Sequence, residues 1–299
     1  MTKAPDTPTT VKAALAALGL APLKRFGQNF LVDPRVLDRV AAAAEIGRGD
    51  VVVEVGPGLG GLTDRLTATG ADVVAVEIDH GLAAHVRRLF ADRPNFALIE
   101  RDVLDGGRVL APELHAALAD RLVGRPPGAW TVAANLPYGV TSPFLLALLD
   151  PPAGPPRRTV VMVQSEVGDV LVAKPGSDAY SVLSLAASVY RRTERLFDVG
   201  PEAFYPRPDV DSCVVALVPR GEDAPPPGPF MDFARGLFQS RRKAIRSSLR
   251  RVVPDRSADE AMAAIAAAGL DPTARVDGVE PERIAALFRA LFPAGTPSS

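Results

Sequence analysis

The chain has 299 residues and a formal net charge of −1, with 47% hydrophobic and 23% charged residues. This length and composition exclude a disordered chain, and no apolar run approaches the roughly 18 residues that a membrane span needs. A single cysteine, Cys213, can form no internal disulfide, and the first ten residues lack the pattern of a secretory signal. We therefore expect a cytoplasmic protein without membrane contact, whose binding of any nucleic acid would depend on local basic patches.

Strand-length apolar runs alternate with helical patterns through the first half of the chain. A helix over residues 11–18 and another over 34–45 come before the predicted strands 51–55, 73–78, 96–99, 130–134 and 159–163. This alternation predicts an α/β fold with a doubly wound, Rossmann-like parallel sheet. Two further strands, 183–190 and 210–218, are expected as an antiparallel closing pair.

Residues 221–230, GEDAPPPGPF, mark a sharp change in composition. Prolines and glycines at this density stop regular structure, so we predict a linker there. Residues 1–220 would then form the sheet domain, and residues 231–299 a small all-helical domain. Its predicted helices cover residues 231–253, 258–268 and 281–291.

A glycine-rich loop, residues 56–61 (GPGLGG), follows the first predicted strand of the sheet and precedes a helix. Glycines here let the backbone approach a ligand beneath a helix N-terminus. The same residues satisfy G-x-G-x-x-G, which is typical of dinucleotide-dependent oxidoreductases. A tight turn that binds nothing is the plain alternative, so the loop alone leaves the ligand open.

Three acidic residues, Glu54, Glu77 and Asp102, fall at the ends of three neighbouring predicted strands. Glu77 can accept hydrogen bonds from ribose hydroxyls, a contact that dinucleotide folds also use. Asp102 is placed to accept a bond from an adenine amine, which favours a nucleoside cofactor without a pyrophosphate. S-adenosylmethionine fits this description, because its cationic groups are drawn to a loop flanked by acids.

The sequence Asn135-Leu136-Pro137-Tyr138 follows the fourth predicted strand. The exocyclic amine of adenine is a poor nucleophile, and two acceptors, the Asn135 side-chain oxygen and the Leu136 carbonyl, can hold its N–H groups and direct its lone pair. Pro137 stiffens the turn, and Tyr138 offers a face on which an extruded base can stack. A strand-ending turn with a half-buried tyrosine is the alternative interpretation.

Residues 235–251 carry seven basic side chains and no acid. The seven are Arg235, Arg241, Arg242, Lys243, Arg246, Arg250 and Arg251. On one continuous helix, four of them would share a face opposite an apolar face. That basic face comprises Arg235, Arg242, Arg246 and Arg250, and the apolar face Phe238, Ile245, Leu249 and Val252. Such a ridge fits a phosphate backbone, with a merely solvated face as the alternative, and Lys24 and Arg25 form a second, weaker basic spot.

No metal site is expected. The three histidines, His80, His85 and His115, lack the spacing of metal ligands. Cys213 has no CxxC partner and is expected to be a small apolar residue in a strand.

Eight segments between residues 23 and 251 resemble the small-subunit ribosomal RNA adenine N6,N6-dimethyltransferases, the family whose loss confers kasugamycin resistance. They are, in order, KRFGQNFL, EVGPGLGGLT, VEID, RDVL, NLPY, VMVQSEV, FYPRPDVDS and SRRKAIRSSL. KRFGQNFL together with NLPY is specific, since unrelated methyltransferases share only the glycine loop.

The resemblance implies transfer of methyl groups from S-adenosylmethionine to N6 of two adjacent adenosines near the 3′ end of 16S rRNA, during small-subunit biogenesis. It implies that residues 1–32 form an arm and cofactor lid, that the helical domain contacts RNA, and that Phe204 and Tyr138 sandwich the target adenine. A monomer acting on the small ribosomal subunit is expected. The implied cofactor-binding residues are Gln28, Asn29, Leu31, Gly56, Gly58, Glu77, Ile78, Asp102, Val103 and Asn135.

Two positions depart from the family pattern. Gly139 follows NLPY where asparagine is common, and Ser181 stands where glycine is common.

Three alternative functions stay open. One is the related large-subunit RNA methyltransferase of antibiotic resistance, which usually reads Asn-Ile-Pro-Tyr and lacks the KRFG lead-in; another is a non-catalytic assembly or nucleic-acid-binding factor of the same fold. The third, a dinucleotide-dependent oxidoreductase, offers no explanation for Asn135–Tyr138.

Overall fold

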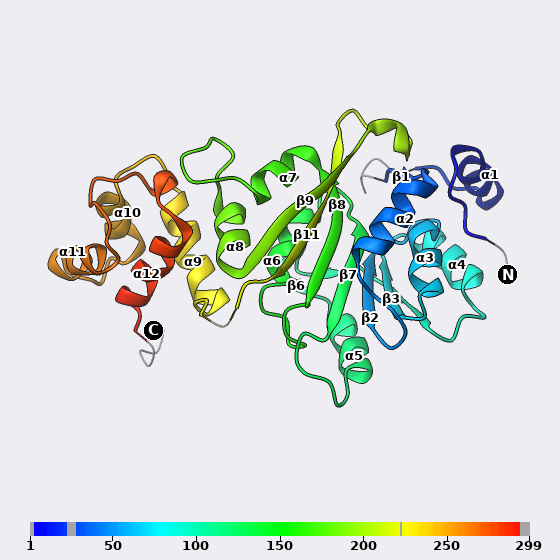
Figure 1. Cartoon of the computed structure of the whole chain (residues 1–299), viewed down its shortest axis with the longest axis horizontal. Coiled ribbons are helices and arrows are strands. Elements are labelled where there is room, and N and C mark those ends of the chain that lie inside the picture. The colour runs from blue at the N-terminus through cyan, green and yellow to red at the C-terminus, as the bar shows by residue number, and fades with distance from the viewer. Residues whose placement is uncertain (1–2, 23–27, 222, 294–299) are drawn as a thin grey trace. The chain divides into compact units, whose positions relative to one another are not determined.

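The structure, a computed structural model, describes residues 3–22, 28–221 and 223–293 (Figure 1). The chain divides into two compact units. The first comprises Met1–Gly168 and Glu194–Pro219, and the second comprises Asp169–Thr193 and Arg220–Ser299. Within the described residues, no helix combines the length and apolarity that crossing a membrane requires.

A seven-stranded sheet with the order β4-β3-β2-β7-β8-β11-β9 forms the centre of the first unit (Figure 1). Its strands are β2 (Val51–Val55), β3 (Asp72–Glu77), β4 (Phe96–Glu100), β7 (Trp130–Asn135), β8 (Arg158–Gln164), β9 (Arg191–Val199) and β11 (Ser212–Pro219). The strands from β4 to β8 in this order are parallel, and β11 runs antiparallel to β8. The doubly wound parallel sheet and its five predicted strands are therefore confirmed.

Helices α1 (Pro8–Leu18), α2 (Pro34–Ala43) and α4 (His80–Leu89) of the first unit begin at residues whose side chains cap them. The Asp33 side chain accepts a hydrogen bond from the Arg35 backbone N–H at 2.8 Å, and Asp79 accepts one from the Leu82 backbone N–H at 3.0 Å. The other helices of this unit are α3 (Gly61–Ala68), α5 (Pro112–Arg121), α6 (Thr141–Ala147) and the start of α7 (Ser165–Leu171).

Helices α2 and α3 pack on one face of the central sheet. Buried apolar side chains of these helices and of the strands form one core cluster there. Its members from β2, β3 and β7 are Val52, Val73 and Ala133. Side chains on a strand alternate between the two faces, so Glu54, Glu77 and Asn135 project from the same face as this cluster, nearer the carboxyl ends of their strands. The fold thus brings these three polar side chains to one edge of the sheet.

Two short antiparallel pairs lie outside the main sheet. Strand β1 (Phe30–Leu31) pairs with β10 (Phe204–Tyr205), which directly follows the 3-10 turn η2 (Pro201–Ala203). Strand β5 (Leu104–Asp105) pairs with β6 (Val109–Leu110) as a hairpin. The first pair ties the segment before α2 to the segment before β11.

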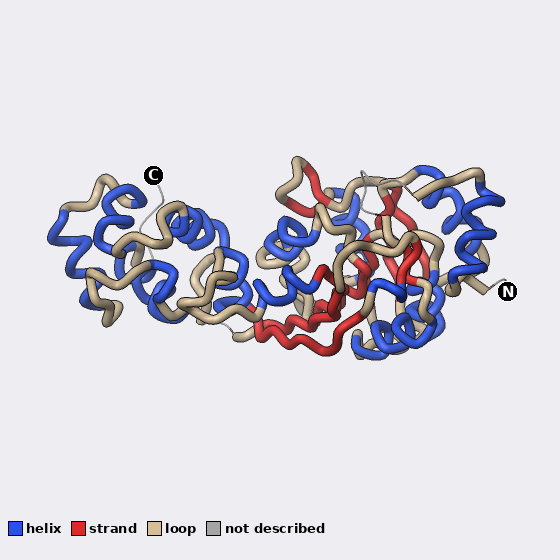
Figure 2. Tube along the Cα trace, turned by 90° about the horizontal axis from the view of Figure 1, so that it is seen from above, coloured by secondary structure: helices blue, strands red, loops and turns tan. Residues whose placement is uncertain are grey.

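In the described residues of the second unit the regular elements are helices, apart from the first residues of β9 (Figure 2). Its helices are α8 (Val182–Tyr190), α9 (Pro227–Phe238), α10 (Ile245–Val252), α11 (Ala258–Ala267), the 3-10 turn η3 (Val276–Gly278) and α12 (Pro281–Leu291). Edge-to-face aromatic contacts join α9 and α12, in which the Phe288 ring lies 5.5 Å from Phe230 and 5.6 Å from Phe233 between centroids.

The strand predicted over residues 183–190 is wrong, because this segment forms α8. An apolar run of this length is compatible with either element, and Ser184 Oγ accepts a hydrogen bond from the Ser181 backbone N–H at 3.0 Å, which starts a helix. The strand beside β11 is instead β9, whose charged residues hid it from the hydrophobic pattern.

The domain boundaries also differ from the expectation. Helix α9 begins at Pro227, inside the predicted linker 221–230, and residues 169–193 group with the second unit although the first domain was expected to extend to residue 220. Proline at the first turn of a helix is favourable, so the proline-rich stretch starts α9 as well as ending the preceding strand.

The continuous helix predicted over residues 231–253 is wrong. Helix α9 ends at Phe238 and α10 begins at Ile245, where the Ile245 backbone N–H donates to the Ala274 carbonyl at 2.8 Å and Ala244 bridges to Arg275. This pairing with a distant segment takes residues 239–244 out of the helical path. The basic residues of α9 and α10 therefore do not share one helix face.

Candidate active site

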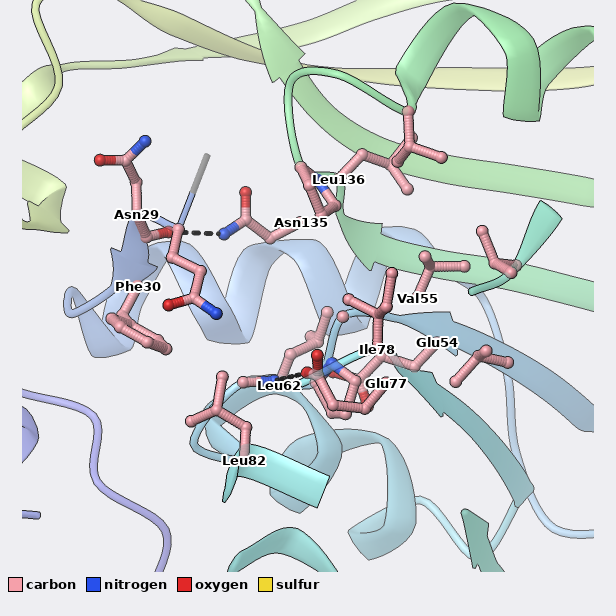
Figure 3. Close-up of a pocket in the computed structure, with 18 of the residues that line it drawn as sticks. Asn29, Phe30, Glu54, Val55, Leu62, Glu77, Ile78, Leu82, Asn135 and Leu136 are labelled. Atoms are coloured by element: carbon pink, nitrogen blue, oxygen red, sulfur yellow. Dashed lines mark hydrogen bonds between the residues drawn. The ribbon is translucent and has the colours of Figure 1, made fainter. Parts of the chain in front are cut away.

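A cavity of about 800 Å³ lies at the carboxyl ends of β2, β3, β4 and β7 in the first unit (Figure 3). Every residue that the sequence resemblance assigned to cofactor binding lines it. These are Gln28, Asn29, Leu31, Gly56, Gly58, Glu77, Ile78, Asp102, Val103 and Asn135. The rest of the NLPY segment, Leu136, Pro137 and Tyr138, lines it as well.

The glycine loop passes close to its neighbours in a conformation that glycine favours. Gly56 and Gly58 have φ values of +68° and +59°. A Cβ on Gly58 would lie 3.1 Å from the Phe30 ring, and one on Gly56 would lie 3.6 Å from Pro137. The loop is therefore fitted between the β1 segment and the NLPY turn, with its backbone exposed to the cavity.

The Glu77 carboxylate is fixed at the cavity wall by two backbone donors. Its Oε2 accepts from the Gly58 N–H at 3.2 Å and its Oε1 from the Asp79 N–H at 3.0 Å. Burial raises the pKa of Glu77, and these two hydrogen bonds act in the opposite direction. A carboxylate held in this way has lone pairs left for ligand hydroxyls.

Glu54 is a second buried carboxyl group in the cavity wall. Its Oε2 accepts a hydrogen bond from Thr63 Oγ1 of α3 at 2.6 Å, and 1% of the residue is exposed. Burial, with a smaller contribution from the nearby Glu77 charge, raises the pKa of Glu54 to about 8. The sequence identified this acid only as part of the sheet edge.

The Asn135 amide is oriented by the segment that precedes β1. Its Nδ2 donates to the Asn29 carbonyl at 3.1 Å, which turns Oδ1 away from that contact (Figure 3). The following turn is fixed by the Pro137 carbonyl, which accepts from the Val140 N–H at 3.1 Å and from Thr141 Oγ1 at 3.3 Å. The site therefore presents a positioned amide oxygen beside the cavity.

Gln28 and Asp102 lie at the rim of the cavity. Gln28 Nε2 donates to Asp79 Oδ2 at 3.4 Å, which connects the lid segment to the start of α4. The exposed Asp102 accepts from the Leu104 N–H at 3.0 Å, and Ile78, which lines the same cavity, is 42% exposed. An exposed apolar side chain together with polar groups in one cavity matches the requirements of a purine ring.

Phe204 is the one predicted catalytic residue that does not line the cavity. It is buried in the core, and its backbone pairs with Leu31. Tyr138 is half-buried at the cavity, and burial raises the pKa of its hydroxyl, with the Ser212 side chain acting in the opposite sense. The predicted basic residues Lys24 and Arg25 lie outside the described residues.

The basic residues of the second unit are in two different situations. Arg241 donates to the Tyr180 carbonyl at 2.7 Å, and Arg235 forms an ion pair with Asp232 at 2.8 Å. Arg251 bonds to Ser240. The remaining members of the predicted set are exposed and form no ion pair with another described residue; these are Arg242, Lys243, Arg246 and Arg250.

Sequence reasoning missed Phe30 and Asp79. The Phe30 ring packs against Gly58, and Asp79 both caps α4 and accepts a hydrogen bond from Gln28. The helix-starting aspartate was a recognisable signal, because it immediately precedes a helical pattern, but the Phe30 contact depends on folding. Across the described residues, no cluster of three or more His, Cys, Asp or Glu side chains is arranged to hold a metal ion.

The fold and the cavity define the class of S-adenosylmethionine-dependent methyltransferases with a Rossmann-like sheet. The cofactor fits the residues present, since the glycine cradle, the buried Glu77 carboxylate and the rim at Ile78 and Asp102 match its methionine part, ribose and purine. The model of the family described as ribosomal RNA adenine dimethylase matches residues 22–291, and the chain belongs to that family.

Sequence relatives agree with this membership, and solved structures share the fold. A protein of Moorella thermoacetica named ribosomal RNA small subunit methyltransferase A is 38% identical over 95% of this chain and 98% of its own length. One of the same name from Streptomyces griseus is 39% identical over 94% of this chain and 93% of its own length. The crystal structure of the 23S rRNA methyltransferase ErmE is 25% identical with a TM-score of 0.61 over 88% of this chain and 99% of that chain. A dimethyladenosine transferase from Plasmodium falciparum shares the fold, with 21% identity and a TM-score of 0.69 over 85% of this chain and 94% of that chain.

Proposed function

We propose that this enzyme transfers methyl groups from S-adenosylmethionine to N6 of two adjacent adenosines near the 3′ end of 16S rRNA, during small-subunit biogenesis. The observation that carries the proposal is the Asn135 amide, held by the Asn29 carbonyl at 3.1 Å beside a cavity that fits a nucleoside cofactor. The names of the small-subunit relatives, at 38–39% identity over nearly the whole chain, support the choice of RNA.

Different residues of the cavity bind different parts of the cofactor. Glu77 accepts from the ribose hydroxyls, Asp102 accepts from the adenine amine, and Ile78 packs on the purine, with Val103 behind it. The backbone of the glycine loop and the lid residues hold the methionine part. The lid and loop residues of this proposal are Gln28, Asn29, Leu31, Gly56 and Gly58.

S-adenosylmethionine, when bound, supplies an electrophilic methyl group on a sulfonium sulfur. Asn135 Oδ1 and the Leu136 carbonyl accept the two N–H groups of the target amine, and this geometry takes the nitrogen out of conjugation and directs its lone pair. No strong general base is needed, because the methylated nitrogen loses its proton to water. The monomethylated amine keeps one N–H, which one of these two acceptors can hold for the second transfer.

Tyr138 provides the stacking face for the extruded adenine, as it lines the cavity next to Asn135. Pro137, which lies against Gly56, keeps this turn in register with the glycine loop. Phe204 supports β1 from the core in the described state, and a direct contact with the base requires β10 to move.

The RNA is held by charge. The exposed side chains Arg242, Lys243, Arg246 and Arg250 of the second unit contact phosphates. Arg235, which is paired with Asp232, and Arg241, which is bonded to the Tyr180 carbonyl, add positive charge. Lys24 and Arg25 are part of the same proposal on the lid side. The protein acts as a monomer in the cytoplasm, with the first unit carrying the chemistry and the C-terminal helices contacting RNA.

The test is a methyl-transfer assay with labelled S-adenosylmethionine on small and large ribosomal subunits that lack the modification. Label should enter only the small subunit, and an Asn135→Ala variant should leave it almost unlabelled. Label in large-subunit RNA alone would favour the antibiotic-resistance type of enzyme. Absence of label from both would contradict the proposal.

A further inference from the structure

Glu54 occupies a central place in the cavity floor that the proposed chemistry does not use. On β2 it pairs with Ala75 of β3, and continuing the β2–β7 register by one residue sets it beside Ala133. Glu77 and Asn135 lie two residues further along those flanking strands, on the same face of the sheet. Glu54 therefore lies one layer deeper, between the proposed ribose acceptor and the amide that orients the target amine (Figure 3).

The surroundings of Glu54 hold little that could balance a negative charge. Thr63 of α3 supplies hydrogen bonds from its side chain and its backbone, and the adjoining Glu77 is itself an acid. The other titratable side chains among the described lining residues are Arg101, Asp102 and Tyr138. Arg101 is already paired with Asp105 at 3.0 Å and with Glu113. Burial in such a place raises the pKa of Glu54 to about 8, so the carboxyl group is mostly protonated at neutral pH when the cavity holds no cation.

We propose that Glu54 gives up its proton when the cationic methyl donor binds, and that the resulting carboxylate makes the cavity prefer the donor over the neutral thioether left after transfer. The proposal rests on the proposed function, in that S-adenosylmethionine is the ligand. This donor carries a sulfonium, an ammonium and one carboxylate, for a net charge of +1, whereas the thioether product lacks the sulfonium charge. Only the Glu54 O–H bond breaks, and the proton passes to solvent.

The physical reason is the low polarity of the cavity floor. A positive charge that enters the cavity is stabilised by a carboxylate there far more strongly than it would be in water, which lowers the pKa of Glu54 in the complex. Binding then releases a proton, so affinity for the donor rises with pH up to the pKa of the empty site and levels off above it. The product lacks the second positive charge and gains less from the same carboxylate.

Calorimetric titration in two buffers of different ionisation enthalpy measures the released protons directly. At pH 7, the wild-type protein should release close to one proton on binding S-adenosylmethionine and clearly fewer on binding S-adenosylhomocysteine. Its affinity for the donor should rise by up to about tenfold per pH unit below pH 8. Glu54→Gln keeps an acceptor for Thr63, and should release no proton and show a flat pH profile.

Thr63→Val is a second variant for the same test. It removes the side-chain hydrogen bond that stabilises the carboxylate and keeps the one from the Thr63 backbone, so the level part of the affinity profile should begin at a somewhat higher pH than in the wild type. Equal proton release with donor and product, or none with the donor, would overturn the role of Glu54 on wild-type data alone. Failure of S-adenosylmethionine to bind at all would overturn the proposed function instead.

Discussion

The cavity of the first unit and the basic segment of the second hold their polar groups in opposite ways. In the cavity, Glu77 and Asn135 each form a hydrogen bond with a backbone atom of a segment distant in sequence. These hydrogen bonds fix the orientation of both side chains. In the basic segment, Arg246 and Arg250 extend from α10 into solvent. The comparison shows that the proposed chemistry depends on single atoms, whereas the proposed grip on RNA depends on summed charge. Substitutions should therefore have large individual effects in the first region and small ones in the second.

The largest effect is expected from Asn135→Ala. Loss of the oriented amide oxygen should lower the single-turnover rate of methyl transfer on the order of 100-fold or more, because this acceptor acts as the nitrogen changes geometry. Affinity for S-adenosylmethionine should fall much less, and the Leu136 carbonyl should leave residual activity. Equal losses of rate and cofactor affinity would restrict Asn135 to the cofactor pocket.

The matched control in the same turn is Gly139→Asn, which restores the residue common in the family. Gly139 is exposed, a Cβ there meets open space, and the turn is held by the Pro137 carbonyl. The rate should stay within about twofold of the wild type. A large gain would show that glycine loosens the turn that aims Asn135.

Glu77→Ala should weaken S-adenosylmethionine binding by about 10- to 100-fold, since a hydrogen bond to a charged acceptor contributes roughly 1.5–3 kcal/mol. Glu100 is its matched control, because it pairs with Glu77 in register on β4 but is exposed and bonds to Arg87. Glu100→Ala should leave affinity unchanged in the same titration. If the two variants behaved alike, Glu77 would be no more than an acid at the end of a strand.

A smaller, distributed effect is expected from replacing Arg242, Arg246 and Arg250 together with glutamine. Affinity for the small subunit should fall, and the log–log salt dependence should flatten by about two to three charge units, with S-adenosylmethionine binding unchanged. The control replaces the exposed first-unit residues Arg48, Arg87 and Arg88 and should leave the salt slope as it was. An unaltered slope in the first triple variant would mean that these arginines are only solvated.

The smallest effect is expected from Ser181→Gly, which restores the other residue common in the family. The Ser181 backbone N–H, which donates to Ser184, is retained, so the free energy of unfolding should change by only a few tenths of a kcal/mol. Thermal or denaturant unfolding measures the change. A loss above about 1 kcal/mol would show that the start of α8 depends on the serine hydroxyl.

Features that depend on local sequence patterns could be predicted, and features that depend on contacts between distant segments could not. The strands, the glycine loop and the acids at strand ends are local patterns, and the parallel topology then brings them together without further information. The break between α9 and α10 could not be predicted, because residues 239–244 contain no glycine or proline. It arises from the hydrogen bond between Ile245 and Ala274, which are distant in sequence. The burial of Phe204 likewise depends on its pairing with Leu31, which lies far away in the sequence.

Identification of the reaction product tests the central claim most directly. Small subunits lacking the modification would be incubated with the wild-type protein and S-adenosylmethionine, and their RNA mapped by mass spectrometry. The account predicts N6,N6-dimethyladenosine at two neighbouring positions near the 3′ end of 16S rRNA. RNA without N6,N6-dimethyladenosine, or with methyl groups on another base or at unconnected positions, would contradict it.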